Sequence, residues 1–133
     1  MSQENVELVR NAYMAGNKGD RDAALRSADP EIVIDATRRV LNPATYVGID
    51  GARQWFAEMD EVWERFGLEM DEFIDAGDRV VVLGRLTGKG KASGVEVEQP
   101  IATVWTVRDG RIIRGEIGYT SRREALEAAG LRE

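Results

Sequence analysis

The stretch Ile101-Ala102-Thr103-Val104-Trp105-Thr106-Val107-Arg108-Asp109-Gly110-Arg111-Ile112 decides the fold class. It contains a run of β-branched and aromatic residues, then Asp-Gly, a dipeptide typical of a tight hairpin turn, and then a second apolar run. Two strands joined by so short a turn must be antiparallel. Similar runs precede it, and the sequence therefore predicts an antiparallel meander with strands at 68–76, 79–89, 95–107 and 111–119.

The N-terminal half instead shows helical periodicity, with apolar residues recurring at spacings of three and four. In this half we expect a helix over about 3–17, a short helix capped by Asp20 and a strand at 32–35. A loop at 38–50 and a helix from Asp50 to Phe66, ended by Gly67, complete it. After the meander we expect one more helix, capped by Ser121. Helices followed by a meander predict an α+β fold. We expect a single domain spanning 1–133, with the helices on one face of the sheet.

The composition excludes several classes of chemistry. The chain has 133 residues, a net charge of −6, no histidine and no cysteine. A disulfide framework, a thiol nucleophile, a Ser-His-Asp triad and a thiolate or imidazole metal site are therefore impossible. We expect no cofactor and no metal, and any proton transfer must use Asp, Glu, Lys, Tyr or water.

The acidic balance argues against binding of nucleic acid, which requires clustered Lys and Arg. No apolar run approaches the roughly 20 residues of a membrane span. The polar, acidic start of the chain does not resemble a signal peptide. We therefore expect a cytoplasmic protein with no membrane partner.

The strand at 101–107 is apolar on both faces. Alternation places Trp105 on one face, and Ala102 and Val104 on the other. An antiparallel sheet that carries one layer of helices normally exposes its second face to water. An apolar second face needs a cover, and we expect a homodimer formed through the sheet.

Asp35 is the first candidate for a chemical role. It ends the apolar run Ile32-Val33-Ile34, and alternation places it on the face of Val33, opposite Ile32 and Ile34. In a partly dry pocket its pKa would rise, and it would become a competent general base. In the alternative, Asp35 pairs with Arg38 or Arg39, or caps the following turn.

Two further polar groups and an apolar wall complete the candidate site. Tyr13 lies on the inner stripe of the first helix, where its hydroxyl either donates into a cavity or is satisfied within the core. Glu116 shares a strand face with Arg114, and the two form either a polar pair that faces inward or an ion pair on the surface. The residues expected to line a ligand pocket are Val33, Trp55, Met59, Thr103 and Trp105.

Several segments together resemble the SnoaL-like proteins of the nuclear-transport-factor-2-like superfamily, which includes ketosteroid isomerases and polyketide cyclases. The segments that carry the resemblance are 13–20 (YMAGNKGD), 29–31 (DPE), 46–51 (YVGIDG), 104–112 (VWTVRDGRI) and 123–131 (REALEAAGL). The resemblance implies a cone-shaped, cystatin-like fold, in which a curved antiparallel sheet wraps around the N-terminal helices and encloses one pocket. It also implies dimers formed through the sheet.

The resemblance also assigns roles to individual positions. Asp35 falls where ketosteroid isomerases keep their proton-shuttling aspartate, whereas Tyr13 lies one place after the position of their tyrosine, and Thr103 replaces their protonated acid. The last-strand acid of the cyclases falls at Ile117, next to Glu116. The implied activity is a metal-free isomerase- or cyclase-like reaction on a hydrophobic, carbonyl-bearing metabolite, with Asp35 as general base. The alternative is a non-catalytic ligand-binding or dimerisation module of the same fold.

Overall fold

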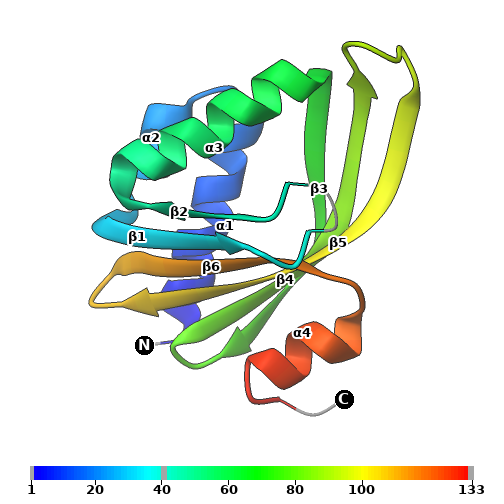
Figure 1. The fold of residues 1–133 in the computed structure, drawn as a ribbon. Helices are drawn as coiled ribbons and strands as arrows, with labels where there is room; N and C mark the ends of the chain where they lie inside the picture. The colour runs from blue at the N-terminus through cyan, green and yellow to red at the C-terminus, as the bar shows by residue number, and fades with distance from the viewer. Residues whose placement is uncertain (1, 40–41, 132–133) are drawn as a thin grey trace.

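The computed structural model of the chain describes residues 2–39 and 42–131. Within these residues the chain forms an α+β fold with a curved sheet (Figure 1). The elements in chain order are α1 (Ser2–Asn17), α2 (Arg21–Leu25), β1 (Ala28–Ala36), β2 (Ala44–Val47), α3 (Gly48–Val62), β3 (Trp63–Ala76), β4 (Arg79–Gly90), β5 (Glu96–Arg108), β6 (Arg111–Tyr119) and α4 (Arg122–Ala128).

The described strands form one sheet in the order β2-β1-β6-β5-β4-β3. The predicted meander β3–β6 is confirmed, and its last turn uses Asp109 and Gly110 at φ 51° and 74°, the left-handed conformation that a tight hairpin requires. The curved sheet is otherwise antiparallel as expected, and the one parallel pair among the described strands is that of β1 with β6. β1 and β6 are far apart in the chain and no hairpin turn joins them, so no local turn requires this pair to be antiparallel.

The helices divide the sheet into two faces. Helices α1, α2 and α3 cover what we call the inner face, and α4 packs against the outer face at the opposite end of the chain (Figure 1). The inner core includes Ile34 and Val80, which are 2% and 0% exposed. The far ends of β4 and β5 extend beyond the helices at the upper right of Figure 1.

The outer face of β5 is covered by the chain itself. Val81 and Val104 are both 0% exposed, and they pack with α4 through Ala125 and Leu126. The Nη1 atom of Arg79 donates to the carbonyl of Ala128 at 3.2 Å, which ties the end of α4 to β4. The two-faced apolar strand was the basis for expecting a dimer, and α4 provides a cover for it. Dimerisation stays a prediction, which light scattering at micromolar concentration can test.

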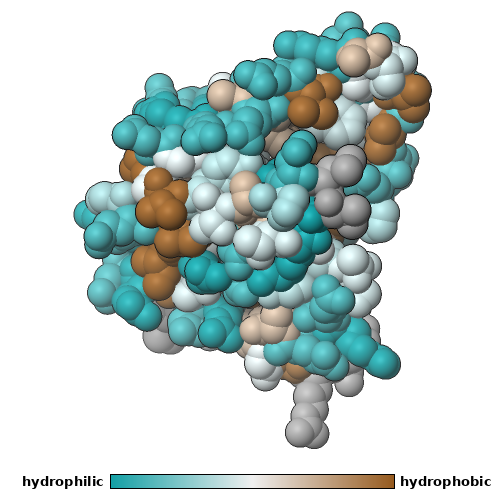
Figure 2. Space-filling model, in the orientation of Figure 1, coloured by the Kyte–Doolittle hydropathy of each residue, from teal (hydrophilic) through white to brown (hydrophobic). Residues whose placement is uncertain are grey.

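Surface hydropathy indicates where apolar side chains remain uncovered. Figure 2 shows a mostly hydrophilic face with hydrophobic surface in two places, one beside the β1–β2 edge and one near the far ends of the long strands. Val47 on the edge strand β2 is 65% exposed, and Val62 and Val95 are 58% and 57% exposed. Val47 and Val62 are the last residues of β2 and α3, and Val95 directly precedes β5.

The third helix differs from its prediction at both ends. It begins at Gly48, whose φ of 74° turns the chain sharply out of β2, and Val47 occupies the N-cap position, not Asp50. It ends at Val62, so that Phe66 lies on β3. Trp63 is already extended and packs over Gly88, where an added Cβ would lie 2.9 Å from the indole ring. The predicted loop at 38–50 also contains β2, which pairs with β1.

The terminal caps follow their predictions. The carboxylate of Asp20 accepts a hydrogen bond from the amide of Ala23 at 3.0 Å and begins α2. The hydroxyl of Ser121 accepts from the amide of Glu124 at 3.1 Å and begins α4. The carboxylate of Glu124 accepts in turn from the amide of Thr120, so the capping box is closed one residue earlier than the usual pattern.

Candidate functional site

A cavity of about 330 Å³ lies between the inner face of the sheet and helices α1, α2 and α3. Its apolar lining comes from Val9, Ala12, Ala24, Leu25, Ala28, Ile32, Ile34, Ala52, Leu68 and Ile112, and its aromatic lining from Tyr13, Trp55, Phe56, Trp63, Phe66 and Trp105. The volume lies at the lower end of the range for small-molecule sites. A wall of this composition selects an apolar or aromatic ligand.

The aromatic residues form two groups, one at the floor and one near the mouth. Trp55 and Phe56 stack on each other on α3, with ring centroids 5.3 Å apart and an angle of 27°. On the floor, the rings of Tyr13 and Trp105 meet edge to face at 6.1 Å. Trp105 is 9% exposed and points from β5 toward α1, because Gly115 on the neighbouring strand leaves room for its ring.

The hydroxyl of Tyr13 is a polar group at the floor of the cavity. It accepts a hydrogen bond from Nε1 of Trp105 at 2.8 Å and is also hydrogen-bonded to Thr103. Burial raises the pKa of Tyr13 to about 12, while the hydrogen bonds with Trp105 and Thr103 lower it. The phenol therefore stays protonated at physiological pH. Because the indole N–H of Trp105 can only donate, that bond leaves the phenolic proton of Tyr13 unused.

Exposed polar residues mark the mouth of the cavity. Arg21 on α2 pairs with Asp60 on α3 through two hydrogen bonds of 2.5 and 2.8 Å. Asn17 at the end of α1 bonds both backbone groups of Leu68 on β3, at 2.7 Å through its Nδ2 and at 3.2 Å through its Oδ1. These contacts join the helices to each other and to the sheet around the opening.

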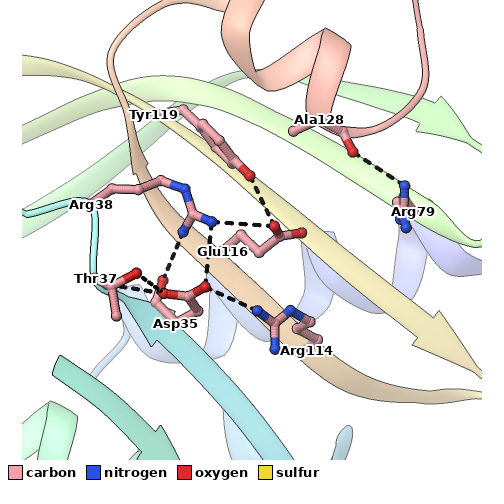
Figure 3. Close-up of polar contacts among 8 residues, drawn as sticks. All are labelled: Asp35, Thr37, Arg38, Arg79, Arg114, Glu116, Tyr119 and Ala128. Atoms are coloured by element: carbon pink, nitrogen blue, oxygen red, sulfur yellow. Dashed lines mark hydrogen bonds and ion pairs between the residues drawn. The ribbon is translucent and has the colours of Figure 1, made fainter.

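Asp35 lies on the outer face of β1, away from the cavity (Figure 3). Its carboxylate accepts hydrogen bonds from the hydroxyl and amide of Thr37 at 2.6 and 3.0 Å, and pairs with Arg38 at 3.3 Å and Arg114 at 2.9 Å. The hydroxyl of Thr37, helped by its amide and by Arg38, lowers the pKa of Asp35, although burial opposes the shift. Asp35 is thus ionised. It pairs with Arg38 and caps the turn at Thr37, and both contacts belong to the alternative in which Asp35 is not a pocket base.

Glu116 joins the same outer-face cluster, which we define as Asp35, Thr37, Arg38, Arg114, Glu116 and Tyr119 (Figure 3). Arg38 bridges the two carboxylates, with its Nη2 3.4 Å from Oε2 of Glu116. The same oxygen accepts a hydrogen bond from the hydroxyl of Tyr119 at 2.9 Å. Burial, reinforced by this bond to Glu116, raises the pKa of Tyr119. The cluster contains two arginines and two carboxylates, so its formal charges cancel.

The structure thus brings the predicted site residues together in two separate places. Tyr13, Trp55 and Trp105 line the cavity, and Thr103 supports Tyr13 from the floor. Asp35 and Glu116 are neighbours across β1 and β6, but on the opposite face of the sheet from the cavity. The remaining two predicted pocket residues are not in its lining: Val33 shares the outer face with Asp35, and Met59 is half-buried on α3 next to the lining residues Trp55 and Phe56.

Several lining residues were not predicted. Alternation placed Ile32 and Ile34 on the face opposite Asp35. This already indicated them as lining residues, because a pocket beneath the helices must contact the most apolar face of the sheet. Phe66 was missed because it was placed in the helix. Arg21 lies in the short second helix and contacts Phe56 and Asp60 far along the chain, and no local pattern indicates such a contact.

Residues 2–39 and 42–131 contain no group of three or more acidic side chains placed to hold a metal ion. Within the same residues, no helix is long and apolar enough to cross a membrane.

The comparisons with known proteins agree with this architecture. An NTF2-like protein of unknown function from Burkholderia pseudomallei has a TM-score of 0.78 and 24% identity, with 87% of this chain and 90% of that chain covered. TerC, crystallised with polyporic acid, has a TM-score of 0.77 and 25% identity, with 87% and 91% covered. A candidate SnoaL-like polyketide cyclase from Jannaschia sp. CCS1 has a TM-score of 0.78 and 26% identity, with 88% and 85% covered.

The fold and the cavity define a protein of the NTF2-like class. The model of the SnoaL-like domain matches residues 9–115, which is most of the chain, and the chain therefore belongs to the SnoaL-like family. The family supports a ligand-binding role or a cyclase- or isomerase-type role. A search of curated proteins finds no match.

Proposed function

We propose that this protein binds a small aromatic or polycyclic molecule in the inner cavity, with an oxygen atom of the ligand hydrogen-bonded to Tyr13. The observation that carries the proposal is the aromatic-walled cavity of about 330 Å³, open at one end, with the phenol of Tyr13 at its floor. A cavity of this volume lies in the range of small-molecule sites, at its lower end. This volume suits a molecule of two or three fused or linked rings.

The polarity of the ligand follows from the hydrogen bonds at the floor. A neutral phenol whose oxygen already accepts from Trp105 is a donor toward a ligand, and it favours a carbonyl, ether or hydroxyl oxygen. TerC, which is 25% identical, was crystallised with polyporic acid, and this supports a small-molecule role for the cavity of the present chain.

A reaction of the isomerase or cyclase type is the catalytic form of the proposal. A general base must lie within about 3 Å of the proton that it removes. The carboxylates that line the cavity are Asp60 and Glu64, at its mouth, and Asp35 lies outside it. The geometry therefore supports binding, with Tyr13 as donor to the ligand oxygen, more strongly than it supports proton abstraction by Asp35. If Asp35→Asn abolished turnover of an identified substrate while ligand binding persisted, the catalytic form would be correct.

A neutral fluorescent probe, N-phenyl-1-naphthylamine, tests the binding site. We expect saturable binding to the wild-type protein with quenching of tryptophan fluorescence, because tryptophans line the cavity. Ala24→Phe places a ring in the cavity and should weaken binding about tenfold or more. The matched control is Ala57→Phe on the exposed side of α3, which should bind as the wild type does. Equal binding by both variants would place the probe elsewhere and contradict the proposal.

The role of Tyr13 is tested with two ligands of nearly the same shape, 1-acetonaphthone and 1-ethylnaphthalene. The first carries a carbonyl acceptor and the second does not. Tyr13→Phe should weaken binding of the ketone about fivefold, the effect of one neutral hydrogen bond of roughly 1 kcal/mol, and leave the hydrocarbon unchanged. Equal changes for both ligands would assign Tyr13 to packing alone.

A further inference from the structure

The guanidinium of Arg21 is fixed at the cavity mouth by contacts that do not depend on Asp60. Its Nη1 donates to the backbone carbonyl of Phe56 at 3.3 Å. Its central carbon lies 4.9 Å from the ring centroid of Phe56 and 6.0 Å from that of Phe66. The Arg21 side chain is 26% exposed, so it is largely enclosed by these aromatic faces. The cation is therefore held in position at the opening of an apolar cavity.

Its anionic partner is held much less firmly. The side chain of Asp60 is 59% exposed, and its carboxylate contacts the two Nη atoms of Arg21 from the solvent side. The hydrogen bond from Arg21 lowers the pKa of Asp60, so the pair is intact at neutral pH. The pair is bidentate, the stronger geometry for arginine and a carboxylate, but the exposure of Asp60 lets water and salt screen it, so that an anionic ligand can compete for Arg21. A carboxylate on the last turn of α3 can rotate into solvent, whereas Arg21 cannot leave without breaking its contacts to Phe56 and Phe66.

The other charged groups at the mouth have partners pointing away from it. Arg65 pairs with Glu96 on β5, and Glu64 pairs with Lys89 on β4. Their side chains are exposed, and neither has the aromatic enclosure that surrounds Arg21. Of the two arginines in the described lining of the cavity, Arg21 is thus the one that is preorganised to meet a ligand.

We propose that Arg21 determines the charge preference of the cavity, by pairing bidentately with an anionic group at the outer end of an aromatic ligand in place of Asp60. This inference rests on the proposed function and specifies its substrate class. With Tyr13 at the floor and Arg21 at the mouth, the ligand carries a neutral oxygen acceptor at its inner end and a carboxylate, sulfonate or enolate at its outer end. Arginine suits this role because its planar fork matches a carboxylate or sulfonate in geometry.

Two probes with the same aromatic rings, one anionic and one neutral, distinguish the effect of charge on binding from the effect of the apolar cavity. The anion 8-anilinonaphthalene-1-sulfonate differs from N-phenyl-1-naphthylamine by its sulfonate. Arg21→Met keeps much of the apolar volume of the side chain and removes the cation. We expect it to weaken the sulfonate probe about tenfold, as the loss of one charged hydrogen-bonded contact implies, and to leave the neutral probe within about twofold.

Asp60→Asn supplies the opposite change. It removes the competing carboxylate and leaves Arg21 in place, so the sulfonate probe should bind about threefold tighter or more, with the neutral probe again unchanged. The matched control is Arg53→Met, which removes an exposed arginine of α3 that pairs with Asp22 outside the cavity lining. It should affect neither probe. All titrations are done at low and at physiological salt, and the advantage of the sulfonate probe should decrease as the salt concentration rises.

The outcomes distinguish failure of the Arg21 inference from failure of the proposed ligand-binding function. If the neutral probe binds and Ala24→Phe blocks it, but Arg21→Met weakens both probes equally, then Arg21 is a packing residue and the inference is wrong. If Asp60→Asn leaves the sulfonate probe unchanged, Asp60 does not compete with the ligand, and the inference is again wrong. If the neutral probe fails to bind the wild-type protein, the proposed function itself fails.

Discussion

The two faces of strand β1 differ completely in chemistry although they are built from alternating residues. Ile32 and Ile34 point inward and are 3% and 2% exposed, and they line the cavity. Val33 and Asp35 point outward, where Asp35 pairs with Arg38 and Arg114. One step along the strand therefore separates a ligand-binding wall from a network of ion pairs.

The difference shows why an ionisable residue in a strand must be assigned to a face before it is assigned a role. A carboxylate at the inner face would lie against apolar side chains and have a raised pKa, the condition for a general base. On the outer face, Asp35 has hydrogen-bond donors on several sides and a lowered pKa. The same residue type at adjacent positions would have opposite acid–base behaviour.

The largest effect is expected where the inner face is made to resemble the outer one. Ile34→Asp buries an unpaired carboxylate, and we expect a loss of about 3–5 kcal/mol in the free energy of unfolding. Val33→Asp, one residue away on the outer face, is the matched control and should cost less than about 1 kcal/mol. Urea denaturation followed by circular dichroism measures both. Similar losses would mean that the two faces do not differ in burial.

A smaller loss is expected from crowding the floor of the cavity. A Cβ added at Gly115 would lie 2.4 Å from Cζ3 of Trp105, so Gly115→Ala must displace the indole ring. We expect about 1–3 kcal/mol of destabilisation, the usual range for overpacking, with a change in near-UV circular dichroism. Gly16→Ala on α1, where a Cβ meets nothing within 4 Å, should instead leave the protein equally or more stable. Unchanged tryptophan signals in Gly115→Ala would contradict the tight contact.

The outer cluster predicts a dependence on pH. The folded state lowers the pKa of Asp35 below the unfolded value of about 3.9, so its ionisation stabilises the protein above that pH. This contribution is lost as the pH falls from about 5 through the lowered pKa. Asp35→Asn should cost about 1–2 kcal/mol at pH 7 and reduce the acid-induced loss of stability. Thermal unfolding at pH 7, 5 and 3 tests this, and parallel pH profiles for variant and wild type would exclude it.

The smallest effect is expected from the exposed arginine of the cluster. The Arg114 side chain is 42% exposed, and Asp35 retains Thr37 and Arg38 when it is removed. Arg114→Met should therefore change the free energy of unfolding by no more than about 0.5 kcal/mol and leave binding of the neutral probe unchanged. A loss above about 2 kcal/mol would mean that the outer cluster depends on this arginine.

Much of the fold could be predicted from the sequence because its signals are local. Alternating apolar residues and turn dipeptides determine the meander, and a side-chain cap identifies each of the short helices at Asp20 and Ser121. Helix α3 was extended too far because Phe66 continues the helical spacing. In the structure, residues 63–66 are a strand because they pair with β4, Trp63 opposite Gly90 and Phe66 opposite Gly88. The periodicity of residues 50–66 alone cannot show a pairing with such a distant segment.

The candidate site was predicted only in part, for a related reason. Trp55 and Trp105 were predicted as pocket residues from their place on inward faces, and both line the cavity. Asp35 was proposed as a pocket base because it ends an apolar strand and falls where ketosteroid isomerases keep their aspartate, although its alternation with Ile34 places it on the opposite face. The pairing of Arg21 with Asp60 joins residues 39 positions apart, and only the packing of α2 on α3 brings them together.

The parallel pairing of β1 with β6 has a consequence for synthesis of the chain. Ile34 lies between Tyr46 of β2 and Gly115 of β6, so the wall of the cavity on β1 acquires its second neighbouring strand only after residues 111–119 have been made. Contacts so distant in sequence slow folding, because a long loop must close before they form. On the ribosome, one edge of β1 should therefore stay unpaired until residues 111–119 have emerged, and the ligand cavity forms only after that.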